Sequence, residues 1–439
     1  MNPRRIYLPK MKKRRIERRD EEEEDRLSSL PDEVIHRIQS FLGARQAVQT
    51  SVLSRRWKHI WSTLPFLTLD YSDQLFPYTH HSIIMFMDNL FLKRSHQTRI
   101  FSFNIFAVYP FPPTFIKKLI NCLNEHNIQQ LHIDLYVHRY SPFQLSTFNS
   151  NSIEKLELCV PLDFTESLEF DCLWDLPKLT TLYLICPPHM SNYELSKSSL
   201  LNLPVLTTLC LDRVELPESL SSFSLPNLTT LIMRRCKLPE TVWDTPALLS
   251  IELNNVLFPE STTDFFSAFV NLRDLTLNLT DTVMKDCFIS CPQLVNLRII
   301  TIMSTRISFD CKIVVMTPKL HSLYCVGILP VTLNVEELEN VNVKLLDTNG
   351  FMNAPMYSKL NYYHRMLIMF AGLGRSKNLT LDSFTIEALS TLFDLGKYYV
   401  SSPFHDLKYV KLPQGYKESS MSTTLRKYLL GGNPRATIV

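Results

Sequence analysis

Residues 176–184 read LPKLTTLYL, and the pattern returns as LPVLTTLCL at 203–211 and as LPNLTTLIM at 225–233. Each copy ends in two apolar residues that are separated by one variable residue. Successive side chains of a β-strand point to opposite faces, so both apolar residues would enter a core and the residue between them would point outward. Each line therefore predicts a short strand that is buried on one face.

The line L-x-x-L-x-L occurs nine times in degenerate form between residues 128 and 325. Successive first positions lie 20 to 27 residues apart, within the range of about 20–29 that is typical of leucine-rich repeats. One unit cannot bury its apolar face alone, so neighbouring units must stack. The pattern predicts a leucine-rich-repeat solenoid with a parallel concave sheet. Its first positions are Ile128, Ile153, Leu179, Leu206, Leu228, Leu248, Leu272, Leu294 and Leu320.

The ninth position of such a repeat is normally Asn or Cys, and it matches clearly only at Cys236. This departure predicts an irregular, imperfectly laddered solenoid. The residues expected to point outward from the strands are Glu157, Tyr183, Cys210, Ile232, Glu252, Thr276, Arg298 and Tyr324.

The outward face of the sheet is the predicted surface for a protein target. Nine strands at a spacing of about 4.8 Å give an arc on the order of 40 Å, which can bury more than the roughly 1,000 Å² of a specific interface. Tyr and Arg are frequent hot-spot residues. The predicted target-binding residues are Tyr183, Arg213, Arg234, Arg235, Arg298 and Tyr324.

A different pattern fills residues 25–70, DRLSSLPDEVIHRIQSFLGARQAVQTSVLSRRWKHIWSTLPFLTLD, where apolar residues fall at helical spacing three times. Pro31 suits the first position of the first helix, and Gly43 suits the position just past its end. Ser54 is a candidate N-cap for the third helix. Three such short helices bury little surface, so the excess of apolar residues indicates that a partner covers part of it.

These residues resemble the plant type of F-box. The matching motifs are Leu30-Pro31, then Val34, Ile35 and Ile38, then Phe41-Leu42, Ala47-Val48, the run 50–57 (TSVLSRRW) and Trp61. The resemblance implies docking onto the Skp-type adaptor of a cullin–RING ubiquitin ligase, with Leu30 and Pro31 at the contact. The adaptor-binding residues that it implies are Leu30, Pro31, Val34, Ile35, Ile38, Leu42, Val48, Val52 and Trp57.

Residues 1–25 carry a basic block followed by an acidic block, which is typical of a solvated, disordered tail. The basic cluster Lys12, Lys13, Arg14 and Arg15 is a candidate nuclear localisation signal, so the expected location is the nucleus, the cytoplasm or both. The net charge of the whole chain is only +3, which argues against nucleic acid as the partner of the main body.

The remainder of the chain continues the alternation of helices and strands. Helices are expected at 83–92 and 115–123 around a strand at 100–108, followed by the solenoid. Beyond residue 349 the repeats become degenerate, and the segment from Phe404 to Val439 resembles the FBD-like C-terminal segment of plant F-box proteins with leucine-rich repeats. The predicted domains are a tail (1–25), an F-box (26–70), a leucine-rich-repeat solenoid (71–345) and a degenerate, FBD-like cap (346–439). The predicted fold class is therefore α/β.

The sequence carries no motif for catalysis or for a cofactor. GxGxxG, GxxxxGK[ST], HExxH and GxSxG are all missing, and the ten cysteines include no CxxC pair. We therefore expect a non-catalytic receptor subunit with no cofactor, no metal and no membrane-spanning segment. Two alternatives remain open: a small-molecule-dependent co-receptor on the same scaffold, for which Arg234-Arg235 would supply a basic cluster, and an adaptor-free nuclear binding scaffold.

Overall fold

The computed structural model divides the chain into two compact units, Met1–Leu64 and Pro65–Val439. The residues that it describes are 29–53, 56–72, 80–94, 98–107, 113–135, 147–159, 173–186, 193–194, 203–216, 221–258, 265–279, 287–301, 313–327, 331–335, 338–346, 356–394, 401–431 and 433–439. The predicted tail and Ser54 lie outside these residues.

The first unit is helical, as predicted. Its elements are α1 (Asp32–Ser40), α2 (Ala44–Gln49), the 3-10 turn η1 (Thr50–Val52), α3 (Trp57–Ile60) and the 3-10 turn η2 (Trp61–Thr63). Two local predictions are wrong by small shifts. Pro31 is the N-cap of α1 and not its first helical residue, and Gly43 is the N-cap of α2 and does not follow α1 directly.

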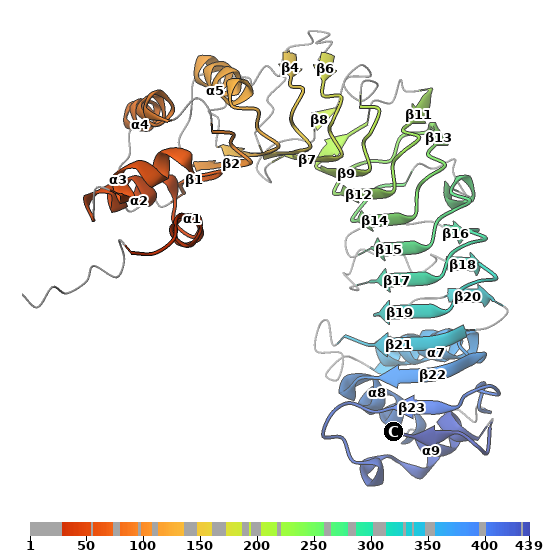
Figure 1. The fold of residues 1–439 in the computed structure, drawn as a ribbon. Coiled ribbons are helices and arrows are strands. Elements are labelled where there is room, and N and C mark those ends of the chain that lie inside the picture. The colour runs from red at the N-terminus through yellow and green to blue at the C-terminus, as the bar shows by residue number, and fades with distance from the viewer. Residues whose placement is uncertain are drawn as a thin grey trace, which may run out of the picture. The chain divides into compact units, whose positions relative to one another are not determined.

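The second unit is organised around one parallel sheet. Fifteen of the described strands join it in the order of the chain, and Figure 1 shows the later ones stacked one after another. They are β1 (Phe66–Tyr71), β2 (Ser102–Ala107), β3 (Gln130–Leu135), β5 (Lys155–Cys159), β7 (Thr181–Ile185), β9 (Thr208–Asp212), β12 (Thr230–Arg234), β14 (Ser250–Asn254), β15 (Asp274–Asn278), β17 (Asn296–Ile300), β19 (Ser322–Val326), β21 (Leu338–Lys344), β22 (Ser376–Leu381), β23 (Tyr409–Lys411) and β24 (Thr437–Ile438). Every repeat line found in the sequence forms one of these strands.

The register of the main sheet is regular over the described strands, in contrast to the irregularity expected of the solenoid. Leu156 pairs with Leu182, Leu182 with Leu209, and Leu209 with Leu231. The same register continues without a slip to β19. It holds because a slip by one residue would turn both buried leucines of a strand to the outside.

The irregularity that the sequence signals lies outside the main sheet. The strands there are short and form separate small sheets: β4 (Thr147–Asn149) with β6 (Leu173–Asp175), β8 (Tyr193–Glu194) with β10 (Val214–Glu215), β11 (Ser222–Ser224) with β13 (Val242–Asp244), and β16 (Cys287–Ile289) with β18 (Ile313–Met316) and β20 (Val331–Asn334).

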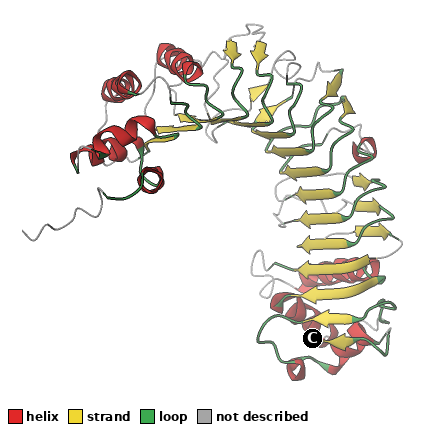
Figure 2. Cartoon of the chain, in the orientation of Figure 1, coloured by secondary structure: helices red, strands yellow, loops and turns green. Residues whose placement is uncertain are grey.

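The helices expected at 83–92 and 115–123 are present. The described helices lie near the two ends of the sheet, whereas the described residues of the middle repeats form short strands outside the main sheet, apart from the turn η3 (Figure 2). The helical elements are α4 (His80–Lys93), α5 (Pro113–Glu125), η3 (Phe265–Ala268), α7 (Met356–Gly372), α8 (Ser383–Asp394), η5 (Glu418–Ser420) and α9 (Thr423–Leu430). Tyr428 of α9 packs on Phe393 of α8, with ring centroids 4.7 Å apart.

The boundary between the units differs from the sequence-based one. The prediction ended the helical module at residue 70, but residues 66–71 form β1, which pairs with β2 from Phe66–Ser102 to Tyr71–Ala107. Strand β1 therefore opens the sheet, although it precedes the first recognisable repeat line.

Candidate functional site

The helical unit has a small core built by α1 and α3. Ile35, Trp57 and Ile60 are buried together, and Leu30 packs against them. Polar contacts also join α1 to residues on either side of α3. The Nε of Arg56 donates to Asp32 Oδ1 at 3.0 Å, and His36 Nε2 lies 3.0 Å from Thr63 Oγ1. This core fixes how α1 presents its other side chains.

Large apolar side chains remain exposed around this core. Val34 and Ile38 of α1 and its C-cap Phe41 fall at positions i, i+4 and i+7, while Val52 and Leu53 stand at the end of η1. Their exposed fractions are 42% for Val34, 37% for Ile38, 74% for Phe41, 87% for Val52 and 52% for Leu53. We call these five residues the exposed apolar set. So much exposed apolar surface on so small a unit indicates a docking site for a partner.

The predicted adaptor-binding residues divide between this set and the core. Val34, Ile38 and Val52 belong to the exposed set, and Pro31 is also exposed. Ile35 and Trp57 are buried, so their place in a list of contact residues is corrected: they support the unit from inside. The half-buried predicted residues are Leu30, Leu42 and Val48.

Two members of the exposed set were absent from the predicted contacts. Phe41 lies seven residues after Val34, so its position in the helical stripe could have identified it. Its ring is capped by the guanidinium of Arg37 at 4.9 Å. Leu53 carries no comparable signal, because its exposure depends on where η1 ends.

The outward face of the main sheet is the second candidate surface. The residues between the buried leucines form one ladder in which each is the register partner of the next: Thr68, Asn104, His132, Glu157, Tyr183, Cys210, Ile232, Glu252, Thr276, Arg298, Tyr324, Asn342, Thr380 and Lys411. All eight ladder residues predicted from the sequence are in it.

Two aromatic residues of this ladder each lie close to a cationic side chain. The guanidinium carbon of Arg298 lies 4.3 Å from the ring centroid of Tyr324, and Lys155 Nζ lies 5.5 Å from that of Tyr183. Arg298 is exposed and both tyrosines are half-buried. Such pairs hold long side chains in place, which lowers the entropy lost when a partner binds.

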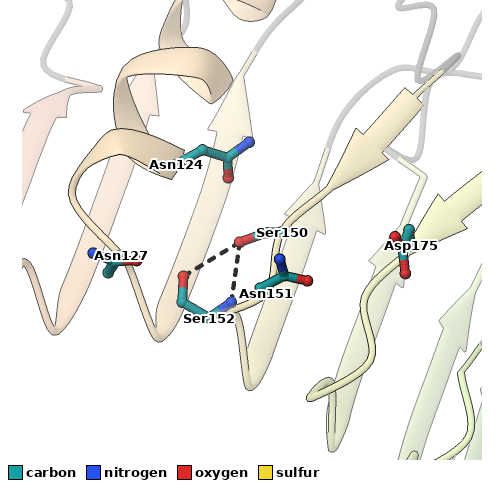
Figure 3. A pocket seen from close by; sticks show the side chains of 6 residues that line it. All are labelled: Asn124, Asn127, Ser150, Asn151, Ser152 and Asp175. Carbon is teal, nitrogen blue, oxygen red and sulfur yellow. Dashed lines mark hydrogen bonds between the residues drawn. The ribbon is translucent and has the colours of Figure 1, made fainter.

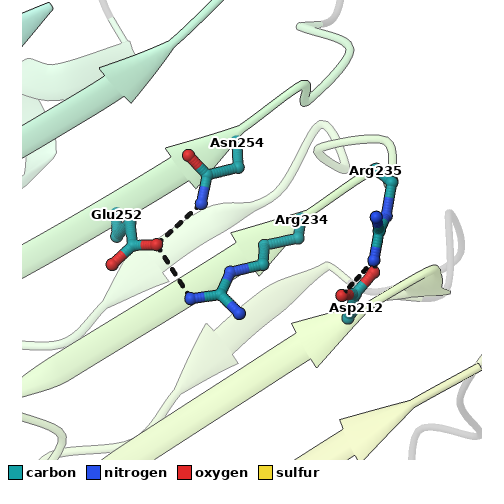
Figure 4. Close-up of polar contacts among 5 residues, drawn as sticks. All are labelled: Asp212, Arg234, Arg235, Glu252 and Asn254. Carbon is teal, nitrogen blue, oxygen red and sulfur yellow. Dashed lines mark hydrogen bonds and ion pairs between the residues drawn. The ribbon is translucent and has the colours of Figure 1, made fainter. Parts of the chain in front are cut away.

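The three predicted arginines in the middle of the sheet are not equivalent. Arg234 Nη2 donates to Glu252 Oε1 at 2.9 Å, and Arg235 Nε donates to Asp212 Oδ1 at 2.9 Å (Figure 4). Burial alone would lower the pKa of Arg234, but the hydrogen bond and the charge of Glu252 raise it above its ordinary value. Because each of these two arginines meets a carboxylate, they do not form the basic cluster that the co-receptor alternative requires.

Arg213 and Arg235 occupy an unusual backbone position. Their φ angles are 57° and 52°, each just past the end of a strand. The N–H of Arg213 donates to Arg234 O at 2.9 Å, and that of Arg235 donates to Asn254 O at 2.8 Å. The left-handed conformation thus adds one backbone hydrogen bond to the sheet ladder at each of these residues. It also fixes the position of the Cα atom from which each arginine side chain extends.

Cys210 stands in the outward ladder as predicted, but it is buried there. It lies between the larger Tyr183 and Ile232 in the ladder and is 1% exposed. Burial raises the pKa of its thiol to about 11. The thiol therefore stays protonated and unreactive at neutral pH.

A polar hollow of about 240 Å³ lies where α5 and the adjoining turns meet (Figure 3). Its lining residues are Asn124, Asn127, Ser150, Asn151, Ser152 and Asp175, and Ser150 Oγ lies 3.3 Å from Ser152 Oγ. Ligand pockets are mostly apolar with a few polar groups, so an all-polar hollow is a weaker candidate than the two surfaces above.

Within the described ranges, no three His, Cys, Asp or Glu side chains are grouped so that they could hold a metal ion. None of the described helices combines the length and the apolar character needed to cross a bilayer. The basic residues Lys12, Lys13, Arg14 and Arg15 lie outside the described residues.

The geometry of the helical unit agrees with comparisons to known proteins. The F-box domain family matches residues 27–69. This chain therefore carries an F-box domain, and it is similar to F-box proteins with leucine-rich repeats. An F-box/LRR-repeat protein of Arabidopsis thaliana is 31% identical over 43% of this chain and 40% of its own length. Another from the same plant is 30% identical over 52% of this chain and 53% of its own length.

A putative FBD-associated F-box protein of Arabidopsis thaliana is 28% identical over 43% of each chain. The resemblance to plant F-box proteins with leucine-rich repeats is thereby confirmed. The chain matches about half, or less, of the length of these curated relatives. The FBD-like character of residues 346–439 stays a prediction.

Proposed function

We propose that this F-box protein is the substrate receptor of a Skp–cullin–F-box ubiquitin ligase. The F-box docks onto a Skp-type adaptor, and through it onto the cullin and RING subunits. The outward face of the main sheet binds a protein target. The chain itself performs no chemistry: it holds target lysines close to a ubiquitin-conjugating enzyme, so its contribution is proximity and orientation.

The observation that carries this proposal is the exposed apolar set of the F-box. Phe41 and Val52 are 74% and 87% exposed, yet the neighbouring core of Ile35, Trp57 and Ile60 is closed. The unit therefore does not need these two side chains to fold. Burying them against an adaptor would remove apolar surface from water at about 25 cal/mol per Å².

A second observation supports target binding by the sheet. The ladder is continuous over the described strands and carries aromatic and arginine side chains, the types that dominate hot spots. A target segment across several strands could meet enough of them for a specific interface.

The adaptor contact is tested by replacing Phe41 and Val52 together with Asp. We expect a loss of at least about thirty-fold in affinity for the Skp-type adaptor, because two charges would enter an apolar contact. The measurement is calorimetric titration of the full chain with purified adaptor.

The control is Leu92→Asp with Val270→Asp. These two residues are also exposed and apolar, but they belong to α4 and to a turn of the second unit. Unchanged adaptor affinity in the Phe41/Val52 variant, or an equal loss in the control, would rule out the proposed docking surface.

The basic cluster at residues 12–15 is proposed to direct the complex to the nucleus. Replacing its four residues with Ala in a fluorescent fusion should then shift the protein toward the cytoplasm, and an unchanged distribution would refute this.

A further inference from the structure

The outward face of the main sheet changes its charge from one end to the other. In the first strands the outward positions include the acidic residues Asp70, Asp134 and Glu157. The basic residues described at outward positions there are Lys155 and His132. In the middle, Arg234 and Arg235 are neutralised by Glu252 and Asp212. The last strands differ from both.

From β17 to β23 the charged residues at outward strand positions are basic. Arg298, Lys344 and Lys411 stand on β17, β21 and β23, and all three are exposed. Within the described part of the chain, no carboxylate lies within ion-pair distance of them. Arg298 is held instead by the ring of Tyr324. We call these three residues the basic row.

Several described carboxylates, among them Glu339, Asp382 and Asp406, lie at or beyond the ends of these strands. Glu339 lies at the start of β21, and Asp382 follows β22. Asp382 Oδ1 accepts the backbone N–H of Thr385 at 2.9 Å and is thereby engaged at the first turn of α8. The basic row therefore keeps its positive potential on the sheet face.

The spacing of the basic row matches an extended polypeptide. Arg298 and Lys344 are two strands apart, as are Lys344 and Lys411. Two strand spacings amount to about 9.6 Å. Lys344 also lies two residues further along its strand than Asn342, the residue in line with Arg298 and Lys411. The row is therefore staggered, with steps of about 12 Å, a length spanned by three to four residues of an extended chain. Between the basic residues the outward positions hold amides and hydroxyls that can bond to a peptide backbone: Ser322, Asn340, Asn342, Asn378 and Thr380.

We propose that the face over β17–β23 binds an extended target segment that carries an acidic residue at every third or fourth position. This inference rests on the proposed function, since the segment would belong to the ubiquitination target. Charge complementarity selects the segment and steers its approach. A polypeptide fits better than a nucleic acid, because three cations separated by neutral side chains give a weak basic field, and the net charge of the chain is only +3.

The test uses the full chain and fluorescein-labelled peptides in an anisotropy titration. The probe repeats Glu-Ala-Ser four times, and its isomer has the same composition with the four Glu residues adjacent. A peptide that repeats Lys-Ala-Ser and a single-stranded oligonucleotide complete the set. We expect the spaced acidic peptide to bind best, and its affinity to fall when salt rises from 0.15 M to 0.5 M.

The key variant is Arg298→Gln with Lys344→Gln and Lys411→Gln, which should weaken binding of the spaced peptide by about ten-fold or more. The matched control removes the same charge elsewhere: Lys178→Gln, Lys319→Gln and Lys427→Gln, two in turns and one on α9. It should bind the peptide like the unmodified chain.

Equal losses in both variants would mean that net charge alone attracts the peptide, and the proposal would be wrong. It would also be wrong if the adjacent-Glu isomer or the oligonucleotide bound as well as the spaced peptide. Adaptor titration of the same variants separates the two proposals. Normal adaptor affinity with no peptide binding overturns only this inference, whereas loss of adaptor binding in the unmodified chain overturns the proposed function.

Discussion

Trp57→Ala should unfold the F-box unit while the sheet unit stays folded. Trp57 is 2% exposed and shares its core with Ile35 and Ile60. Truncating a buried Trp to Ala costs about 3–5 kcal/mol, and a unit of this size has little stability in reserve. Amide hydrogen exchange should therefore rise throughout residues 29–64 and remain slow in β2 and β3. Adaptor binding should disappear with the fold.

The control for this experiment is Phe41→Ala. Phe41 is 74% exposed, so its truncation should leave exchange in the F-box unchanged while it weakens adaptor binding. Together the two variants distinguish a residue that stabilises the F-box fold from a residue that contacts the adaptor. Slow exchange in the F-box of the Trp57 variant would show that the described core does not hold the unit together.

Among the described glycines of the sheet unit, Gly327 should be the one whose replacement by Ala has the largest effect. Gly327 follows β19 with a φ of +88°, and an added Cβ would lie 2.0 Å from the backbone oxygen of Thr301. The backbone strain costs about 1–3 kcal/mol, and the clash with a hydrogen-bonded backbone adds to it. We expect a clear fall in the midpoint of urea unfolding.

Gly415→Ala provides a closely matched control. Its φ is +84°, but nothing lies within 4 Å of an added Cβ. This variant therefore carries the strain without the clash, and its midpoint should fall less. Equal midpoints in the two variants would mean that the close approach of residues 301 and 327 does not limit stability.

The repeat architecture could be predicted from the sequence because its signal is local. Two leucines in LxL fix the buried face of a strand, and a spacing of about 20–29 residues fixes which strands are neighbours. The in-register ladder from Glu157 to Tyr324 follows from those two facts. Strand β1 could not be found in this way, because residues 66–71 precede the first repeat line.

The candidate surfaces were harder to predict because they depend on contacts between elements. The helical stripe places Val34, Ile35 and Ile38 together, but only packing against α3 decides that Ile35 is buried and Val34 is not. Likewise Arg234 and Arg235 are adjacent in sequence, yet their carboxylate partners come from different strands, at Glu252 and Asp212. Neither ion pair could be predicted from the residues of a single segment of the sequence.

The central claim is that the F-box docks an adaptor through side chains that its own core leaves exposed. The most direct measurement is amide hydrogen exchange of the full chain with and without a purified Skp-type adaptor. We predict new protection within residues 30–53 and none in the strands of the main sheet. Binding of the adaptor without protection in residues 30–53, or with protection confined to the sheet, would contradict the claim.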